Sequence, residues 1–384
     1  MNTEPTNVHV ALAHWTFAPT TGGVESHISD LARLLLQAGV RVTVLTGEPF
    51  PSPIPGVSVI TFDWLNLGRV KTKSDSDCAA DVDRVRSEIE RFVSDMAIDV
   101  VHGHNLHHFS SAPALAMNSL HSRFRLFHTF HETWPDLLAD SPVYRFWDGN
   151  FAVSAHVQRE CDRRLGYKPE LRQLGVDLER FAWTPVRQRT VPLRILHPAR
   201  LLPWKGVHVS VRALAILRSE GIEARLTITD NQRIADWHDE LSGYRQRILG
   251  EVQDLGVVDS VDFCSPTFEE MPSLYQDADV VVYPTVGEEP YGLVPLEAMS
   301  SGRPVVVSRS GGLTETIIDG ETGFVVDRGD SVALASRLRE LASPSGLRER
   351  MGRAGRAHVE QNFNAISYAS KMLQRYTAPS EANS

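Results

Sequence analysis

The sequence contains few cysteines, no long apolar run and no excess of positive charge. Its 3 cysteines are far apart and form no CxxC pair, which argues against a disulfide framework or a zinc finger. The formal net charge of -9 argues against a nucleic-acid-binding protein, because phosphate binding needs a basic face. No stretch approaches the roughly 18 apolar residues of a membrane span, and residues 1–10 lack the features of a signal peptide. We therefore expect a cytoplasmic protein.

The chain length and the apolar pattern together predict two α/β domains. A length of 384 residues exceeds one ordinary core. Short β-branched runs alternate with helix-like stretches, which is typical of parallel sheets with crossover helices. These runs lie at 8–13, 41–46, 57–61, 100–102, 125–129 and 151–153, and then at 194–197, 225–229, 261–263, 280–284, 304–307 and 324–326.

An aperiodic stretch between the two series marks the expected linker. Residues 184–192 are rich in proline, arginine, glutamine and threonine. We therefore place a Rossmann-like N-terminal domain at 1–185 and a Rossmann-like C-terminal domain at 186–362. A last helix at about 363–376 is expected to pack back onto the first domain.

The most informative motif lies in residues 287–299, directly after an apolar run. It holds Glu289 and Glu297 with seven residues between them. Ligands of open α/β sheets bind beyond the carboxyl ends of the strands, so this loop should line a binding site. Glu289 would accept hydrogen bonds from sugar hydroxyls, and Glu297, two helical turns further on, would reach the hydroxyls of a ribose.

The same segment should contain the start of a helix. Its unpaired N–H groups and positive dipole end suit a pyrophosphate, and glycine lets a phosphate approach the backbone closely. The residues expected to form this donor-binding backbone are Tyr291, Gly292, Leu293 and Val294.

A second motif places two cations after the run at 194–197. Arg200 and Lys205, the latter followed by Gly206, would lie where a diphosphate leaving group develops charge. Stabilising such charge typically contributes a few kcal/mol to a barrier. An R-x4-K pair alone is common on solvated surfaces. Here the pair precedes the two glutamates in the same predicted domain, and this combination indicates a diphosphate-binding site.

Together these motifs resemble those of the family-4 retaining glycosyltransferases, also called glycosyl transferases group 1. The resemblance covers essentially the whole chain and is strongest at 194–326. It implies the GT-B fold, in which two Rossmann-like domains face each other across a cleft, with the acceptor bound by the first domain and the nucleotide sugar by the second. It also implies that Glu289 contacts the transferred sugar, that Glu297 contacts the donor ribose, and that Arg200 and Lys205 bind the diphosphate.

A glycine pair precedes the first expected helix, at 24–37. Gly22 and Gly23 could form a turn that approaches a phosphate, or simply a tight turn with positive φ. In the resembling family this loop lies close to the donor phosphates and the acceptor. Both glycines are therefore candidates for donor binding, and Glu25 is a candidate for acceptor binding.

Several histidines follow strand ends of the first domain. His131 could present a ring nitrogen to a sugar hydroxyl, or it could be a satisfied buried histidine. The family commonly has His followed by Asp here, whereas this chain has Glu132. We count His131 among the catalytic candidates, and Glu132, His107 and His108 among the residues expected to line the acceptor pocket.

The sequence predicts no metal and no cofactor. His102, His104, His107 and His108 crowd one strand end, but they lack the spacing and the carboxylate partner of a known metal site. Asp-x-Asp pairs, which metal-dependent transferases use, occur at 75/77, 81/83 and 277/279. The first two lie in a polar stretch and the third directly precedes a strand, so we interpret all three as structural.

We thus expect a metal-independent retaining transfer from a nucleotide sugar to a hydroxyl of a small soluble acceptor such as a polyol, cyclitol or natural-product intermediate. The expected donor is a UDP-sugar. Three alternatives stay open: a nucleotide-sugar epimerase of the same fold, a non-catalytic sugar-nucleotide binder, and a transferase that uses a membrane lipid. The last rests on Arg69, Lys71 and Lys73, whose attraction to a membrane the acidic residues at 75–83 weaken. The oligomeric state is left open.

Overall fold

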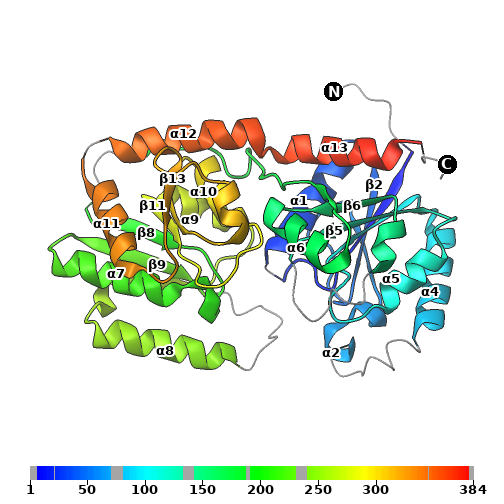
Figure 1. Cartoon of the computed structure of the whole chain (residues 1–384), viewed down its shortest axis with the longest axis horizontal. Coiled ribbons are helices and arrows are strands. Elements are labelled where there is room, and N and C mark those ends of the chain that lie inside the picture. The colour runs from blue at the N-terminus through cyan, green and yellow to red at the C-terminus, as the bar shows by residue number, and fades with distance from the viewer. Residues whose placement is uncertain are drawn as a thin grey trace. The chain divides into compact units, whose positions relative to one another are not determined.

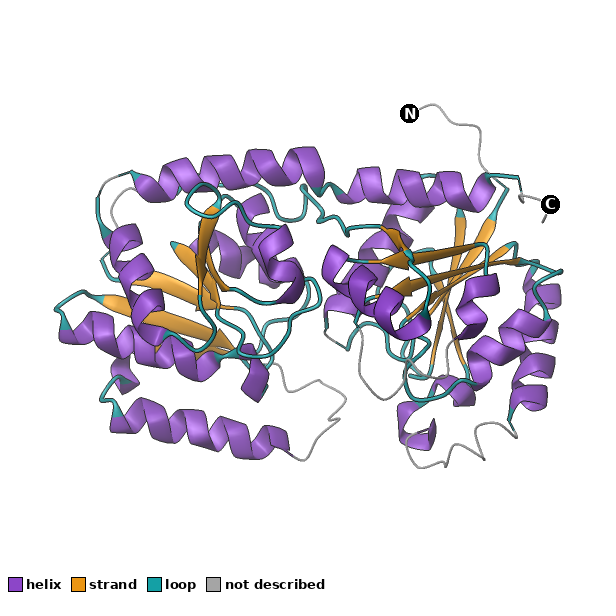
Figure 2. Cartoon of the chain, viewed as in Figure 1, coloured by secondary structure: helices purple, strands orange, loops and turns teal. Residues whose placement is uncertain are grey.

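The computed structural model describes residues 7–20, 22–70, 81–132, 142–186, 191–230, 240–344 and 346–379 (Figure 1). The chain divides into two compact units. Unit 1 comprises Met1–Leu174 and Ala365–Ser384, and unit 2 comprises Gly175–Asn364. In each unit, helices lie on both sides of a parallel sheet (Figure 2).

Unit 1 is built on a seven-stranded sheet with the order β3-β2-β1-β4-β5-β6-β7. Its strands are β1 (His9–Ala13), β2 (Arg41–Thr46), β3 (Ser58–Thr61), β4 (Val100–His104), β5 (Arg125–Phe130), β6 (Gly149–Ala152) and β7 (Glu170–Leu171). Its helices are α1 (Gly23–Gln37), α2 (Leu67–Val70), α4 (Val82–Met96), α5 (Ala112–Ser119), α6 (Ala155–Leu165) and α13 (Ala365–Thr377), with short 3-10 turns at Asp63–Leu65 and Pro142–Phe146.

Unit 2 is built on a six-stranded sheet with the order β10-β9-β8-β11-β12-β13. Its strands are β8 (Leu193–His197), β9 (Ala224–Thr229), β10 (Val261–Cys264), β11 (Val280–Tyr283), β12 (Val305–Ser308) and β13 (Gly323–Val326). Its helices are α7 (Val207–Ser219), α8 (Glu240–Asp254), α9 (Met271–Asp277), α10 (Leu293–Ser300), α11 (Ser331–Ala342) and α12 (Leu347–Asn362), with 3-10 turns at Pro203–Lys205, Val258–Ser260 and Gly311–Glu315.

The central strands of both sheets are buried, as their apolar composition predicts. Every residue of β1, β11 and β12 is buried, as expected for parallel strands covered on both faces by helices. Valines of β11 and β12 join the apolar core that α7 and α11 complete. The twelve apolar runs expected from the sequence correspond to strands in the structure, and the two-residue β7 is an additional one.

The strand order creates one switch point in each sheet. In unit 1, β1 pairs with β2 on one side and with β4 on the other. In unit 2, β8 pairs with β9 on one side and with β11 on the other. Loops that leave two adjacent strands in opposite directions open a crevice between them, and open α/β sheets bind ligands there. The two loops after β8 and β11 are those that carry the Arg200–Lys205 and Glu289–Glu297 motifs.

The boundary predicted at 185/186 differs from the division of the structure, which falls after Leu174. The segment at 175–186 belongs with unit 2 because its backbone is bound there by side chains of that unit. Ser300 Oγ donates to the carbonyl of Phe181 at 2.7 Å, and the Arg356 guanidinium donates to the same carbonyl at 3.2 Å. The backbone N–H of Thr184 donates to the carbonyl of Ser301. The aperiodic stretch at 184–192, from which the boundary was predicted, therefore lies beyond the end of the first part of unit 1 at Leu174.

Helix α13 packs on unit 1, although it follows unit 2 in the chain. It contacts α1. The Tyr376 hydroxyl and Nδ1 of His102 in β4 are hydrogen-bonded at 2.5 Å, and the Arg125 guanidinium of β5 donates to the carbonyl of Arg375 at 2.8 Å. Both contacts hold the last helix to the central strands. Among the described residues, no helix combines the length and the apolar character needed to cross a membrane.

Candidate functional site

The loops after β8 and β11 are bound to each other through one carbonyl group. The carbonyl oxygen of Trp204 accepts hydrogen bonds from Thr285 Oγ1 at 2.6 Å, from the N–H of Val286 at 2.8 Å and from the N–H of Gly287 at 3.2 Å. Gly206, with φ of 76°, lies against the same loop. The two predicted donor-binding motifs therefore form one continuous surface of unit 2.

Lys205 and Glu289 form a buried ion pair on this surface. Lys205 Nζ lies 2.6 Å from Oε2 of Glu289 and 2.7 Å from the hydroxyl of Tyr283, the last residue of β11. The Tyr283 hydroxyl also donates to Oε2 of Glu289 at 3.1 Å. The exposed fractions of the two charged side chains are only 13% and 11%. The two motifs thus meet in a cation–carboxylate–phenol triad, which a bound sugar nucleotide would have to join.

The surroundings shift the pKa values of Lys205 and Tyr283. Burial lowers the pKa of Lys205, but the Glu289 carboxylate and Tyr283 outweigh burial, so the pKa lies above its ordinary value. Burial, followed by the charge of Glu289, raises the pKa of Tyr283 to about 12. The positive charge of Arg200 acts in the opposite direction and lowers the pKa of Lys205.

Helix α10 begins where the sequence predicted a helix start. Gly292 is the residue before its first turn and has φ of 88°, which favours glycine. Tyr291 is buried, whereas Gly292, Leu293 and Val294 are half-buried. The first N–H groups of α10 have no partner within the helix and carry its positive dipole end. This end of α10 can therefore receive an anionic group beside the triad.

Glu297 lies further along α10 and is held by a tyrosine. The Tyr275 hydroxyl donates to Oε2 of Glu297 at 2.5 Å. Burial, and then the charge of Glu297, raises the pKa of Tyr275 well above its ordinary value, so the hydroxyl keeps its proton. Glu297 is half-buried. It does not belong to the Lys205–Glu289 pair, and its contact with the donor ribose stays a prediction.

The loop after β12 supports Glu289 from behind. The N–H of Glu289 donates to Ser310 Oγ at 2.9 Å, and the N–H of Gly312 donates to the carbonyl of Glu289 at 2.8 Å. A Cβ atom at Gly311, which has φ of 42°, would lie 2.2 Å from the Glu289 carbonyl oxygen. The segment at 310–312 therefore fixes the backbone that carries the carboxylate.

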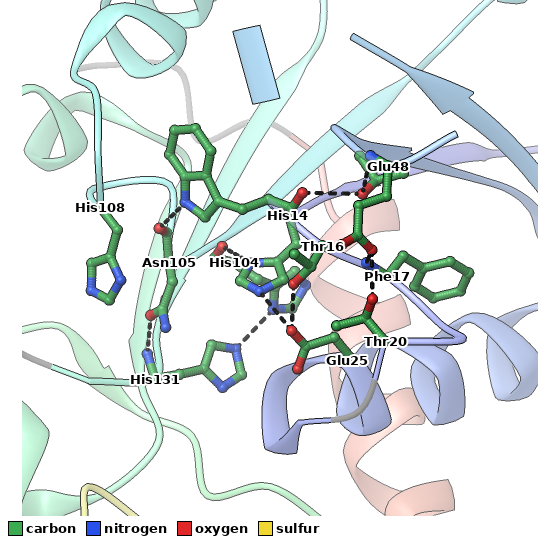
Figure 3. Close-up of polar contacts among 12 residues, drawn as sticks. His14, Thr16, Phe17, Thr20, Glu25, Glu48, His104, Asn105, His108 and His131 are labelled. Atoms are coloured by element: carbon green, nitrogen blue, oxygen red, sulfur yellow. Dashed lines mark hydrogen bonds and ion pairs between the residues drawn. The ribbon is translucent and has the colours of Figure 1, made fainter. Parts of the chain in front are cut away.

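In unit 1, a carboxylate from the first turn of α1 lies against the loop after β1, where the sequence indicated a turn that could approach a phosphate (Figure 3). The Thr16 hydroxyl donates to Oε1 of Glu25, and His14 Nε2 lies 3.8 Å from the same oxygen. The alternative of a tight turn with positive φ does not hold at Gly22, which is extended with φ of -171°. A Cβ at Gly22 would instead lie 2.2 Å from Oε2 of Glu25. The missing side chain of Gly22 thus gives room to the Glu25 carboxylate, and Gly23 begins α1.

A second carboxylate, missed from the sequence, fixes the same loop. Glu48 Oε2 accepts hydrogen bonds from Thr20 Oγ1 at 2.7 Å and from the N–H of Phe17 at 3.4 Å. Burial raises the pKa of Glu48, and Thr20 and Phe17 oppose this effect. Glu48 directly follows β2 and one glycine, and this position at a strand end was the available sequence signal.

The predicted acceptor-side histidines gather around Asn105, which follows β4. The Asn105 side-chain oxygen accepts from the N–H of His131 at 2.7 Å, and its nitrogen donates to Glu132 Oε1 at 3.3 Å. His108 Nδ1 lies 3.5 Å from the same carboxylate oxygen, and a ring nitrogen of His107 lies 3.2 Å from the Glu132 carbonyl oxygen. The structure therefore brings together His107, His108, His131 and Glu132.

The structure describes two of the three Asp-x-Asp pairs, those at 81/83 and 277/279. Asp279 is buried and bound to the backbone N–H and guanidinium of Arg194, while Asp81 and Asp83 pair with Arg84 and Arg86. These contacts give the three aspartates structural partners. The pair at 75/77 lies outside the described residues.

Two family models match the chain. The model of glycosyltransferase family 4 covers residues 21–180, and the model of glycosyl transferases group 1 covers residues 186–358. The chain is 26% identical to glycogen synthase of Mycobacterium tuberculosis, with 97% of this chain and 95% of the relative aligned. It is 29% identical to D-inositol 3-phosphate glycosyltransferase of Paenarthrobacter aurescens, with 96% of each aligned.

Solved structures share the fold at low sequence identity. Sucrose-phosphate synthase from Thermosynechococcus elongatus matches with a TM-score of 0.78 and 22% identity, covering 96% of this chain and 98% of that one. HepE from Anabaena, solved with UDP and glucose, matches with a TM-score of 0.75 and 20% identity, covering 96% and 99%. The two sheets described above are the Rossmann-like halves of the GT-B fold.

The chain belongs to the family-4 glycosyltransferases, of the group-1 type. It is a glycosyltransferase that acts on a nucleotide sugar.

Proposed function

We propose that this protein transfers a sugar from a UDP-sugar, bound by unit 2, to a hydroxyl of a small soluble acceptor, bound by unit 1, with retention at the anomeric carbon and without a metal ion. The observation that carries the donor part is the buried Lys205–Glu289 pair beside the start of α10 at the β8–β11 switch point. UDP as the nucleotide is supported by the similarity to HepE, which was solved with UDP and glucose.

In the proposed reaction, Lys205 and Arg200 stabilise charge on the departing diphosphate. The bond between the anomeric carbon and the β-phosphate oxygen breaks, and the acceptor oxygen bonds to that carbon on the same face. The leaving phosphate oxygen takes the acceptor proton. Glu289, held by Lys205 and Tyr283, accepts hydrogen bonds from the transferred sugar, and Glu297 accepts them from the ribose.

His131 enters this reaction as a neutral hydrogen-bonding group. Burial, followed by the charges of neighbouring histidines, lowers the pKa of His131 well below its ordinary value. Its imidazole is therefore uncharged at neutral pH and would position a hydroxyl rather than supply a proton.

The proposed acceptor is neutral and polyhydroxylated because the polar groups on the unit 1 surface suit hydroxyl groups. Glu25, Glu48 and Glu132 offer carboxylate oxygens, which accept hydrogen bonds from hydroxyls. The alternative of a lipid acceptor rests on a basic segment of which only Arg69 is described, and Arg69 pairs with Asp63. Its partner reduces the charge that this residue could offer to an anionic membrane.

The proposal is tested by an activity screen of UDP-sugars against polyols and cyclitols, with NMR assignment of the anomeric configuration of the product. A parallel incubation without acceptor addresses epimerisation. An α-linked product from an α-linked donor, together with an unchanged donor in the control, is expected. Release of the epimer of the donor sugar, or an inverted product, would contradict the proposal.

Turnover is expected to survive removal of divalent ions, because lysine and arginine fill the charge-stabilising role that a metal ion has in other transferases. The assay compares initial rates before and after dialysis against EDTA, followed by addition of manganese or magnesium. A loss of activity that manganese reverses would show that a metal is needed.

Glutamine substitutions of Glu289, in the loop before α10, and of Glu297, on α10, are expected to impair different properties of the enzyme. Glu289→Gln weakens contacts to the transferred sugar, so turnover should fall and discrimination between donors that differ at one sugar hydroxyl should relax. Glu297→Gln should mainly weaken binding of the nucleotide, including UDP, which carries no sugar. Calorimetric titration of both variants with UDP separates the two roles.

Glu288→Gln is the matched control for this pair, because Glu288 is exposed and pairs with Arg328 at the surface. It should leave turnover and UDP affinity near those of the natural protein. If Glu289→Gln loses affinity for UDP while Glu297→Gln keeps it, the roles assigned to the two residues are exchanged.

A further inference from the structure

Three buried histidines of unit 1 converge from different elements. His27 lies on α1, His104 is the last residue of β4, and His131 directly follows β5. One ring nitrogen of each lies within 4.8 Å of the others. His104 Nδ1 and His131 Nε2 are 2.9 Å apart (Figure 3), and the ring centroids of His27 and His131 are 5.4 Å apart.

Two ring nitrogens in this cluster lack a hydrogen-bond partner among the described residues. They are Nε2 of His27 and Nε2 of His104, and both are buried. An unsatisfied buried polar atom typically costs about 1–3 kcal/mol. The proposed transfer reaction needs only His131 of the three, so it does not account for His27 or for the two unsatisfied nitrogens. A metal ion bound by Nε2 of His27 would give that atom a partner. Nε2 of His104 is not explained in this way, because Nδ1 is the His104 nitrogen that lies beside His131.

We propose that His27, His104 and His131 form a binding site for a divalent transition metal ion, of which zinc is the representative, and that the bound ion inhibits the enzyme. Imidazole is a good ligand for zinc, copper and nickel, and three histidines with one open position are a common zinc ligand set. This ion is an inhibitor at the acceptor side, and the proposed transfer does not use it.

The distances require only small movements. Zinc binds imidazole nitrogen at about 2.0–2.1 Å, which places two tetrahedral ligand atoms about 3.3 Å apart. The His104 and His131 nitrogens at 2.9 Å would separate slightly, and the ligand nitrogen of His27, which lies within 4.8 Å of theirs, would have to move closer. The open fourth position would hold water or a hydroxyl of a ligand.

Inhibition is expected because His131 has two proposed roles, as a ligand of the metal ion and as a group that binds the acceptor hydroxyl. A metal ion on its ring would withdraw it from the acceptor hydroxyl, so zinc should raise the acceptor KM. This second part rests on the proposed function, whereas binding of the ion does not.

Binding is tested on the full chain, freed of metal, with zinc chloride and a chromophoric chelator as competitor. We expect one zinc ion per chain. His27→Phe keeps a ring that can pack against Tyr368, whose centroid is 5.0 Å away, but offers no ligand atom, so zinc affinity should fall by at least about 100-fold, beyond the 10- to 100-fold typical of changes to second-shell groups. His27→Cys supplies a thiolate ligand and should bind zinc at least about tenfold more tightly than His27→Phe.

His358→Phe is the matched control, since it removes a half-buried histidine from α12 in unit 2 and should leave zinc affinity and turnover unchanged. Absence of stoichiometric zinc binding, or equal affinity of the natural protein and His27→Phe with both folded by circular dichroism, would overturn the site. Zinc binding that depends on His27 without any rise in the acceptor KM would overturn the inhibitory role alone and would place His131 outside the acceptor site.

Discussion

Lys205→Ala is expected to lower turnover by on the order of a hundredfold or more, with a smaller effect on donor affinity. The lysine ammonium acts on charge that grows on the diphosphate as the sugar departs, so its loss is felt most in the transition state. Arg200→Ala should show the same pattern, because both cations face one anion. Single-turnover rates and donor affinities of each variant provide the measurement.

The structure adds a second consequence for Lys205. Its removal leaves the Glu289 carboxylate buried beside Tyr283 without its cation. Breaking a buried ion pair in this way typically costs about 3–5 kcal/mol. Lys205→Ala should therefore also lower the midpoint of urea unfolding, whereas Arg200→Ala, which leaves the Lys205–Glu289 pair intact, should do so much less.

A double variant separates catalysis from stability. Lys205→Met combined with Glu289→Gln removes both charges and keeps similar shapes, so stability should largely return while turnover stays low. Tyr283→Phe, which keeps the ion pair and removes one hydroxyl, is the control and should lower turnover far less than Lys205→Ala. Recovery of turnover in the double variant would show that Lys205 serves only to stabilise the fold.

Gly206→Ala is expected to destabilise unit 2 by about 4 kcal/mol or more, a size that requires a specific structural cause. A Cβ atom at this position would lie 1.9 Å from the carbonyl oxygen of Pro284, and φ is 76°. The backbone oxygen cannot rotate away as a side chain could, because the loop after β11 is bound to Trp204. Chemical unfolding followed by fluorescence measures the loss.

Gly221→Ala is the matched control for this change. Gly221 has nearly the same backbone angle, with φ of 77°, but a Cβ there would meet nothing within 4 Å. Its cost should be that of the left-handed conformation alone, about 1–2 kcal/mol. Equal losses for the two variants would mean that the loops of the donor site separate easily and that the close approach carries no strain.

The sequence predicted the strands of both sheets and the positions of the donor motifs because both are local patterns. Runs of β-branched residues identify buried parallel strands, and Gly292 directly precedes the helix that the motif predicted. The strand order then explains why motifs 84 residues apart meet, since β8 and β11 are neighbours. That adjacency is a property of the topology and not of either segment.

Individual side-chain contacts between distant segments were not predicted from the sequence. The ion pair between Lys205 and Glu289 was not predicted. The sequence analysis assigned Lys205 to the diphosphate and Glu289 to the transferred sugar, and it did not consider a contact between them. His27 was missed since it lies within an amphipathic helix, where a histidine has no distinguishing pattern. The division of the structure differs from the predicted boundary because the hydrogen bonds that hold residues 175–186 to unit 2 come from Ser300 and Arg356, far along the chain.

The carbonyl group of Trp204 has a consequence for changing the donor specificity of this enzyme. Because it accepts hydrogen bonds from three successive residues of the loop after β11, the shape of that loop depends on the path of the loop after β8. Exchanging residues 285–292 alone for those of a relative would combine that relative's loop after β11 with this chain's loop after β8. The hydrogen bonds to the Trp204 carbonyl would then join two loops whose shapes do not match. A successful exchange of donor preference should transplant residues 200–206 and 285–292 as one piece.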